Sequence, residues 1–187
     1  MRIAGGEFRG RNLLVPKGED VRPTQDRVRE ALFNILQGAV AGASFLDLFA
    51  GSGAVGLEAL SRGASVATLV ELAPRHIACI EKNVSALGAA PRVRVVRADV
   101  YEWLAGPCAG GYDIVFADPP YALGAEKGYA DMLAVLAARN VVKPGGLFIA
   151  EMKHRQAPDV SPAWEVCRDR VYGQTRLVVY RRLEETA

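Results

Sequence analysis

Short apolar runs alternate along this chain with stretches of helical period. Five runs are almost wholly apolar, as in strands that are buried on both faces of a parallel sheet; they cover residues 44–49, 66–70, 93–96, 112–117 and 147–150. Between them, apolar residues recur every three or four positions, which predicts helices that bury one face. The alternation of strand and helix at short spacing predicts an α/β domain with a doubly wound, mostly parallel sheet.

The two ends of the chain depart from this alternation. Residues 2–15 are rich in glycine and alternate weakly, which predicts a β-hairpin whose apolar side would be Phe8, Leu13, Leu14 and Val15. Residues 166–180 predict a second hairpin, which would add an antiparallel edge to the sheet. We therefore expect an amino-terminal hairpin extension over residues 1–20 and a main domain over residues 21–187.

Composition narrows the class of protein. Of the 187 residues, 50% are hydrophobic and 24% are charged, which is typical of globular proteins in water. No apolar run reaches the roughly 20 residues of a membrane span, and the amino terminus lacks the apolar core of a signal peptide. The three cysteines and two histidines fit neither a metal site nor a disulfide framework. We therefore expect a cytoplasmic protein, most simply a monomer, with no metal and no membrane partner.

Charge is distributed unevenly although the net charge is only +2. Residues 1–30 hold seven basic against five acidic side chains, and residues 153–182 hold seven against three. A polyanion could contact such ends, although solvated faces alone also produce this bias. On the helix that is predicted to begin at residues 23–24, Arg27 and Arg29 lie outside the apolar stripe, as does Arg22 just before it.

A glycine-rich turn follows the first buried run. Gly51, Gly53 and Gly56 match the G-x-G-x-x-G pattern, and Glu71 lies 20 residues beyond Gly51, as in dinucleotide-binding proteins. Asp47 lies at the mouth of the same turn, where it would repel a pyrophosphate and attract an ammonium group. The pattern therefore favours S-adenosylmethionine, which has an amino group, a sulfonium and a ribose, over NAD. Asp99, after the third run, could accept from an adenine amino group or cap a helix.

The run at residues 112–117 ends in the corner Asp118-Pro119-Pro120-Tyr121. Two prolines prevent the chain from continuing as strand or helix, and open α/β sheets bind ligands at this edge. The exocyclic amine of a base is a weak nucleophile, since its lone pair is delocalised into the ring. The Asp118 carboxylate and the Pro119 carbonyl could each accept one of its N–H groups, and Tyr121 could stack on the base. Taken alone, such a corner is more often a plain turn.

Two motifs together carry a resemblance to a known family. Residues 47–53, Asp-Leu-Phe-Ala-Gly-Ser-Gly, with the corner at residues 118–121 resemble the class I S-adenosylmethionine-dependent amino-methyltransferases, which have a Rossmann-like sheet. Over nearly its whole length the chain is similar to the RsmD-type bacterial 16S rRNA guanine-N2 methyltransferases. The supporting stretches are residues 5–11, 22–34 and 172–175.

The resemblance implies roles for individual residues. Asp118, Pro119 and Tyr121 would act on the target guanine, whose N2 would receive the methyl group. The cofactor, which leaves as S-adenosylhomocysteine, would be bound by Thr24, Asp47, Phe49, Gly51, Ser52, Gly53, Glu71, Leu72, Asp99 and Val100. The RNA would be bound by Arg9, Arg11, Arg22 and Arg27. The partner implied is 16S rRNA within an assembled or assembling small ribosomal subunit.

Two other functions stay open on the sequence. Asp-Pro-Pro-Tyr is shared by adenine-N6, cytosine-N4 and guanine-N2 enzymes, so the motif predicts amine chemistry without choosing the base. The chain could therefore be a DNA adenine-N6 or other nucleic-acid amino-methyltransferase, although such enzymes usually carry extra residues that read a duplex. It could also be a non-catalytic rRNA-binding assembly factor that retains the fold.

Overall fold

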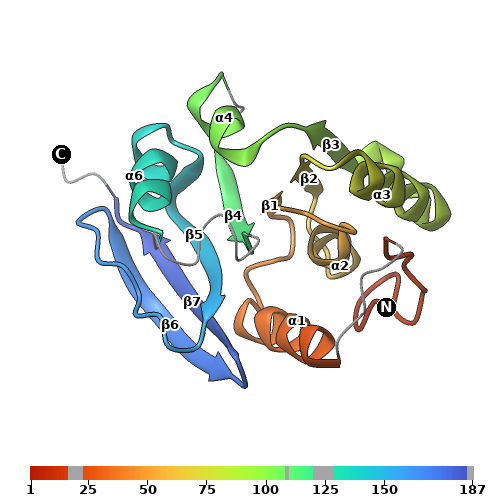
Figure 1. The fold of residues 1–187 in the computed structure, drawn as a ribbon, viewed down its shortest axis with the longest axis horizontal. Coiled ribbons are helices and arrows are strands. Elements are labelled where there is room, and N and C mark those ends of the chain that lie inside the picture. Colours follow the sequence, from red (N-terminus) through yellow and green to blue (C-terminus); the bar gives the residue numbers. More distant parts are fainter. Residues whose placement is uncertain (17–22, 108–109, 120–128, 185–187) are drawn as a thin grey trace. The chain divides into compact units, whose positions relative to one another are not determined.

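A computed structural model of the protein describes residues 1–16, 23–107, 110–119 and 129–184 (Figure 1). Contacts divide the chain into two compact units, Met1–Val100 and Tyr101–Ala187. Within the described part, no helix is both long enough and apolar enough to cross a membrane.

The strands form a seven-stranded mixed sheet. In the first unit, β1 (Ser44–Leu48), β2 (Val66–Glu71) and β3 (Val93–Arg97) are parallel and lie in the order β3-β2-β1. In the second unit the order is β4-β5-β7-β6, with bounds β4 (Tyr112–Ala117), β5 (Val142–Lys153), β6 (Trp164–Tyr172) and β7 (Thr175–Arg182). β4 and β5 are parallel, whereas β7 is antiparallel to both β5 and β6. The expected mostly parallel sheet with an antiparallel carboxy-terminal edge is confirmed.

The helices of the described part are α1 (Pro23–Ile35), α2 (Ala54–Ser61), α3 (Pro74–Leu87), α4 (Val100–Ala105) and α6 (Ala130–Ala138), with a 3-10 turn at Ala90–Arg92. In the first unit, α2 packs on β1 and β2, and α3 packs on β3. The short helix α4 was not predicted, because six residues are too few to show a periodic apolar stripe.

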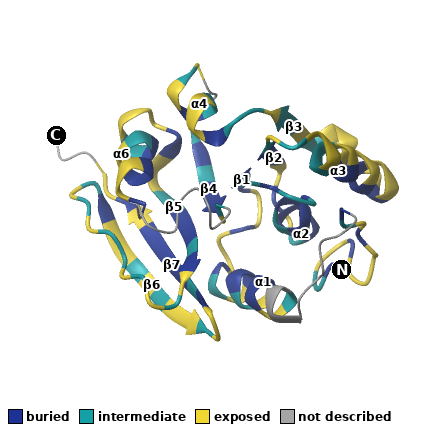
Figure 2. Ribbon diagram, viewed as in Figure 1, coloured by how far each residue is buried: buried dark blue, intermediate teal, exposed yellow. Residues whose placement is uncertain are grey.

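Most residues of the strands β1, β4 and β7 are buried (Figure 2). Four of the five residues of β1 are buried, and so are five of the six in β4, because both strands are covered on their two faces. The edge strand β6 is mostly exposed, while β7, between β5 and β6, is mostly buried. The core of the second unit includes an aromatic cluster in which the Phe148 ring lies 5.9 Å from Tyr180 and 6.1 Å from Trp164.

The amino-terminal segment is folded against the first unit. It forms a single antiparallel bridge, Arg2 to Asn12, with turns between, so the predicted hairpin is shorter than expected. Phe8 and Leu13 are buried as predicted, but Leu14 is 54% exposed, so its assignment to the apolar side was wrong. Gly6 has φ 79°, and a Cβ there would lie 1.7 Å from the carbonyl oxygen of Ser61, which only glycine avoids.

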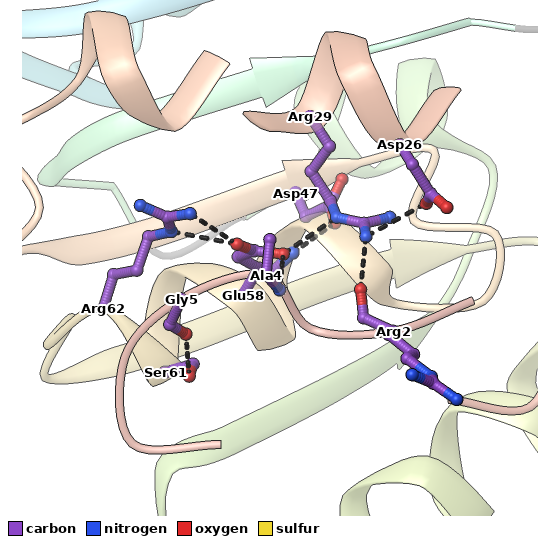
Figure 3. Close-up of polar contacts among 10 residues, drawn as sticks. Arg2, Ala4, Gly5, Asp26, Arg29, Asp47, Glu58, Ser61 and Arg62 are labelled. Carbon is purple, nitrogen blue, oxygen red and sulfur yellow. Dashed lines mark hydrogen bonds and ion pairs between the residues drawn. The ribbon is translucent and has the colours of Figure 1, made fainter. Parts of the chain in front are cut away.

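A buried carboxylate anchors this segment. Glu58 of α2 is fully buried and accepts hydrogen bonds from Arg29 at 2.9 Å, from Arg62 and from the backbone N–H of Ala4 at 3.2 Å (Figure 3). Arg29 is only 5% exposed and also donates to the carbonyl of Arg2. Arg29 lies outside the apolar stripe of α1, yet it is buried, because it pairs with the buried carboxylate of Glu58 on another helix.

Replacing Glu58 by glutamine should destabilise the protein by roughly 3 kcal/mol, because the buried guanidinium of Arg29 and the partly exposed one of Arg62 lose their charged partner. Urea unfolding followed by circular dichroism measures the change. Glu81→Gln, at an exposed position of α3, is the matched control, and its urea midpoint should equal that of the wild-type protein within error. Equal midpoints for the two variants would show that Glu58 does not anchor the segment.

Candidate active site

The glycine-rich turn after β1 has an unusual backbone. Phe49 has φ 66°, Gly51 has φ 56° and Gly53 has φ 77°, all in the left-handed region. That conformation costs a non-glycine residue such as Phe49 roughly 1 kcal/mol or more, and such strain gathers at functional sites. A Cβ built on Gly51 would meet no atom within 4 Å, so the turn is open at this position.

Asp47 connects this turn to α2. Its side chain is 1% exposed, and Oδ2 accepts the backbone N–H of Gly56, in the first turn of α2, at 2.9 Å. A Cβ on Gly56 would lie 2.2 Å from Cδ2 of Leu69, so the helix approaches β2 too closely for a larger residue. Asp47 therefore satisfies one orphan donor of the helix start, a structural role beside the predicted cofactor contact.

Glu71, at the end of β2, holds the other side of the turn. One oxygen accepts the N–H of Gly51 at 2.8 Å and lies 3.3 Å from Nδ1 of His76. The other oxygen accepts the N–H groups of Leu72 and Ala73, each at 2.8 Å. Leu72, beside this carboxylate, is 55% exposed and offers an apolar surface. The structure thus brings together three of the predicted cofactor-binding residues, Gly51, Glu71 and Leu72.

Asn83 of α3 was missed by the sequence analysis. It is 1% exposed; its Nδ2 donates to the carbonyls of Ser52 and Leu14, each at 3.0 Å, and its Oδ1 accepts the N–H of Leu14 at 2.7 Å. Asn83 therefore ties the amino-terminal segment to the glycine-rich turn. The sequence held a signal, because Asn83 lies between Ile80 and Val84 on the apolar stripe of its helix.

Of the other predicted cofactor-binding residues, Asp99 and Val100 lie at the start of α4. Asp99 is the residue just before α4, the N-cap position, and Val100 is buried at the start of that helix. The side chain of Thr24 lies outside the described residues. So do Arg22 and Tyr121, whose roles stay predictions.

The predicted RNA-binding arginines of the described part are exposed. Arg9 lies in the turn of the amino-terminal segment, and Arg27 lies on α1. Arg11 is exposed too, but its guanidinium donates to the carbonyl of Ala86 near the end of α3. Arg11 therefore helps to cap a helix, and at least one of its guanidinium N–H donors is already used within the protein.

In the second unit, β4 delivers Asp118 and Pro119 to its carboxyl end. Solvent reaches the Asp118 side chain, yet the protein around it excludes enough water that desolvation raises its pKa to about 6. Glu151 on the neighbouring strand β5 also has a raised pKa, through desolvation and the charge of Asp118. The sequence analysis missed Glu151, although a carboxylate after the fifth apolar run follows the same pattern as Glu71 and Asp118.

Tyr129, just before α6, links the two strands. Its hydroxyl donates to the carbonyl of Glu151 at 2.7 Å and lies 3.2 Å from the carbonyl oxygen of Ala117. The side chain is 3% exposed, and burial, followed by the charges of Asp118 and Glu151, raises its pKa well above the ordinary value. The phenol therefore stays neutral and fixes the backbone on either side of the two carboxyl groups.

The raised pKa of Asp118 predicts a pH-dependent stability. An unfolded-state pKa near 3.8 and a folded-state pKa near 6 mean that the stability present at low pH is lost as pH rises through this window. Asp118→Asn cannot ionise, so its stability relative to wild type should rise by about 1 kcal/mol between about pH 4 and pH 6, after allowance for solvent screening. Chemical unfolding at several pH values measures it. Asp131→Asn, at an exposed position of α6, is the control, and an equal rise in both variants would contradict the cause given.

Comparisons with known proteins agree with this arrangement. The family model described as conserved hypothetical protein 95 matches residues 1–181. The ribosomal RNA small subunit methyltransferase D of Escherichia coli K12 is 39% identical over 183 residues, which are 97% of this chain and 90% of that protein. The protein of the same name from Haemophilus influenzae is 34% identical, over 97% of this chain and 92% of its own. The solved structure of the yhhF protein of Escherichia coli superimposes with a TM-score of 0.86 at 38% identity and covers 99% of both chains. The chain belongs to the conserved hypothetical protein 95 family, which the model matches almost from end to end.

Proposed function

We propose that this protein transfers a methyl group from S-adenosylmethionine to the exocyclic N2 of a guanine in 16S rRNA, and that it does so as a single chain in the cytoplasm. The observation that carries the proposal is a solvent-accessible carboxyl group at the end of β4, followed by the Pro119 carbonyl, in a chain similar over nearly its whole length to rRNA methyltransferases. The products would be N2-methylguanine and S-adenosylhomocysteine.

The first unit has features that suit the cofactor. The turn is open at Gly51, the carboxylate of Glu71 lies beside it, and the apolar side chain of Leu72 is exposed next to that carboxylate. When bound, S-adenosylmethionine supplies a methyl carbon activated by a sulfonium. Glu71 would accept from the ribose hydroxyls, Leu72 would cover the adenine, and Asp99 would accept from its amino group. Asp47, Phe49, Ser52, Gly53, Thr24 and Val100 would complete the site.

The second unit would bind the amino group of the target guanine. The carboxylate of Asp118 and the carbonyl of Pro119 each accept one N–H of the guanine amino group, which draws the nitrogen toward tetrahedral geometry and frees its lone pair. Positive charge develops on this nitrogen during transfer, and the Asp118 carboxylate stabilises it. A pKa of about 6 leaves Asp118 mostly ionised at neutral pH, so it is ready to accept. Tyr121 would stack on the base.

Recognition of RNA would rest on four arginines, of which Arg9, Arg11 and Arg27 are exposed. Arg9 and Arg11 belong to the segment that Glu58 and Asn83 anchor to the first unit, and Arg22 and Arg27 lie at or near the start of α1. Guanidinium groups bind phosphate in a fixed geometry, and these four would position the RNA without reading its sequence. A ribosomal subunit, assembled or assembling, would present an unstacked loop base, which lowers the cost of extrusion.

Replacing Asp118 by alanine should lower the rate of methyl transfer by about 100-fold or more, because the charge on nitrogen loses its acceptor. Its affinity for S-adenosylmethionine, measured by calorimetry, should stay within about twofold of wild type, since the cofactor contacts lie elsewhere. Asp113→Ala, in the same strand, is the control. The role of Asp118 would have to be abandoned if rate and cofactor affinity fell together or if transfer persisted.

Replacing Arg9 and Arg11 together by alanine should weaken binding to the small subunit and lower the salt dependence of log K by about one for each lost phosphate contact. Arg9→Ala alone is the cleaner variant, because Arg11 also caps α3. Lys143→Ala on β5, which removes a cation paired with Asp113, should leave the salt slope unchanged. Wild-type affinity in the double variant would show that this segment does not contact RNA.

A further inference from the structure

Asp118 and Glu151 are neighbours across two strands. β4 and β5 are parallel, and Ala117, the last residue of β4, is paired with Ala150, so Asp118 just past the end of β4 lies beside Glu151 of β5. Adjacent strands lie about 4.8 Å apart, and residues in register project from the same face of the sheet. The two carboxyl groups are therefore side by side, and the charge of Asp118 acts directly on Glu151.

The surroundings of this pair, as far as the structure describes them, raise the pKa of both carboxyl groups. In the described part of the chain, neither carboxyl group forms an ion pair; desolvation acts on both, and the charge of Asp118 acts on Glu151 in the same direction. Among the described residues, other titratable groups of this region are the phenols of Tyr129, Tyr101 and Tyr180, from the turn before α6, from α4 and from β7, and the carboxylate of Asp159, which accepts the backbone N–H of Tyr129. Tyr129 donates to the backbone carbonyl of Glu151, so it positions the strand without supplying charge.

Two desolvated carboxyl groups at this spacing cannot both be ionised cheaply, so at neutral pH the pair retains one proton. The proton belongs on the member that ionises later. Asp118 lies past the end of β4 and is exposed, whereas Glu151 lies within β5 and is partly buried, so ionisation costs more at Glu151, and the negative charge of Asp118 raises the pKa of Glu151 as well. Glu151 is therefore the protonated member and Asp118 the carboxylate.

We propose that Glu151 is a positioning residue that keeps a proton beside Asp118 and so holds Asp118 as the single carboxylate that accepts from, and then deprotonates, the amine nitrogen. This inference rests on the proposed function of Asp118. The nitrogen lone pair forms the bond to the methyl carbon while the carbon–sulfur bond breaks, and that electron pair stays on sulfur. The nitrogen, now positive and carrying two hydrogens, gives one proton to Asp118. The pair then holds two protons and releases one to water, which restores its starting state.

Glutamine is the informative replacement, because it resembles a protonated glutamate in shape and charge. Glu151→Gln should keep methyl transfer at pH 7 within about threefold of wild type, whereas Glu151→Ala should lose roughly tenfold or more in kcat with little change in KM. Glu165→Gln, at an exposed position of β6, is the matched control. If Glu151→Gln were as impaired as Glu151→Ala, an ionised Glu151 would be required and the inference would be overturned.

A second readout does not depend on activity. Carbon-13 NMR of the side-chain carboxyl groups should show Asp118 titrating in two coupled steps in the wild-type protein and in a single step in Glu151→Gln, with both steps kept in Glu165→Gln. An identical single-step curve for Asp118 in all three proteins would show that Asp118 and Glu151 do not share a proton, and would overturn the inference. Absence of methyl transfer in the wild-type protein would instead contradict the proposed function, and the NMR titration would still decide whether the two groups share a proton.

Discussion

The carboxylate of Glu71 is the constraint on which the first unit depends. It accepts three backbone N–H groups, from Gly51, Leu72 and Ala73, and so joins the glycine-rich turn to the end of β2. On the other side of the turn, the carboxylate of Asp47 accepts the backbone N–H of Gly56 and so joins β1 to the start of α2. A loop with left-handed residues at Phe49, Gly51 and Gly53 would be costly to order without such partners. The turn is therefore held in shape before any ligand arrives, which lowers the cost of binding.

The same unit ties its amino-terminal segment to this turn by polar groups that are themselves buried. Asn83 bridges Leu14 and Ser52, and Glu58 bridges Arg29, Arg62 and Ala4. The second unit differs, because desolvation raises the pKa values of Asp118 and Glu151, and both groups destabilise the fold when they ionise. Such a cost is typical of groups retained for reaction chemistry, since a carboxylate with a raised pKa is a better proton acceptor.

The sheet was predictable because its buried strands are almost continuous apolar runs, as at residues 44–48 and 112–117. Asp47, Glu71 and Asp118 were predictable as site candidates because each lies on or next to the end of a strand. The burial of Arg29 was not predictable, because its buried partner Glu58 belongs to a helix that only the fold brings near. The hydrogen bonds of Glu71 and the pairing of Asp118 with Glu151 depend on strand register, which apolar runs do not encode.

The most direct measurement is the identity of the modified nucleoside. Small ribosomal subunits from a strain that lacks this protein would be incubated with the protein and S-adenosylmethionine, digested, and analysed by mass spectrometry. The account predicts N2-methylguanosine, gained at one position and absent when the protein is omitted. A methylated adenosine or cytidine, or unmodified RNA from subunits that the protein binds, would contradict it.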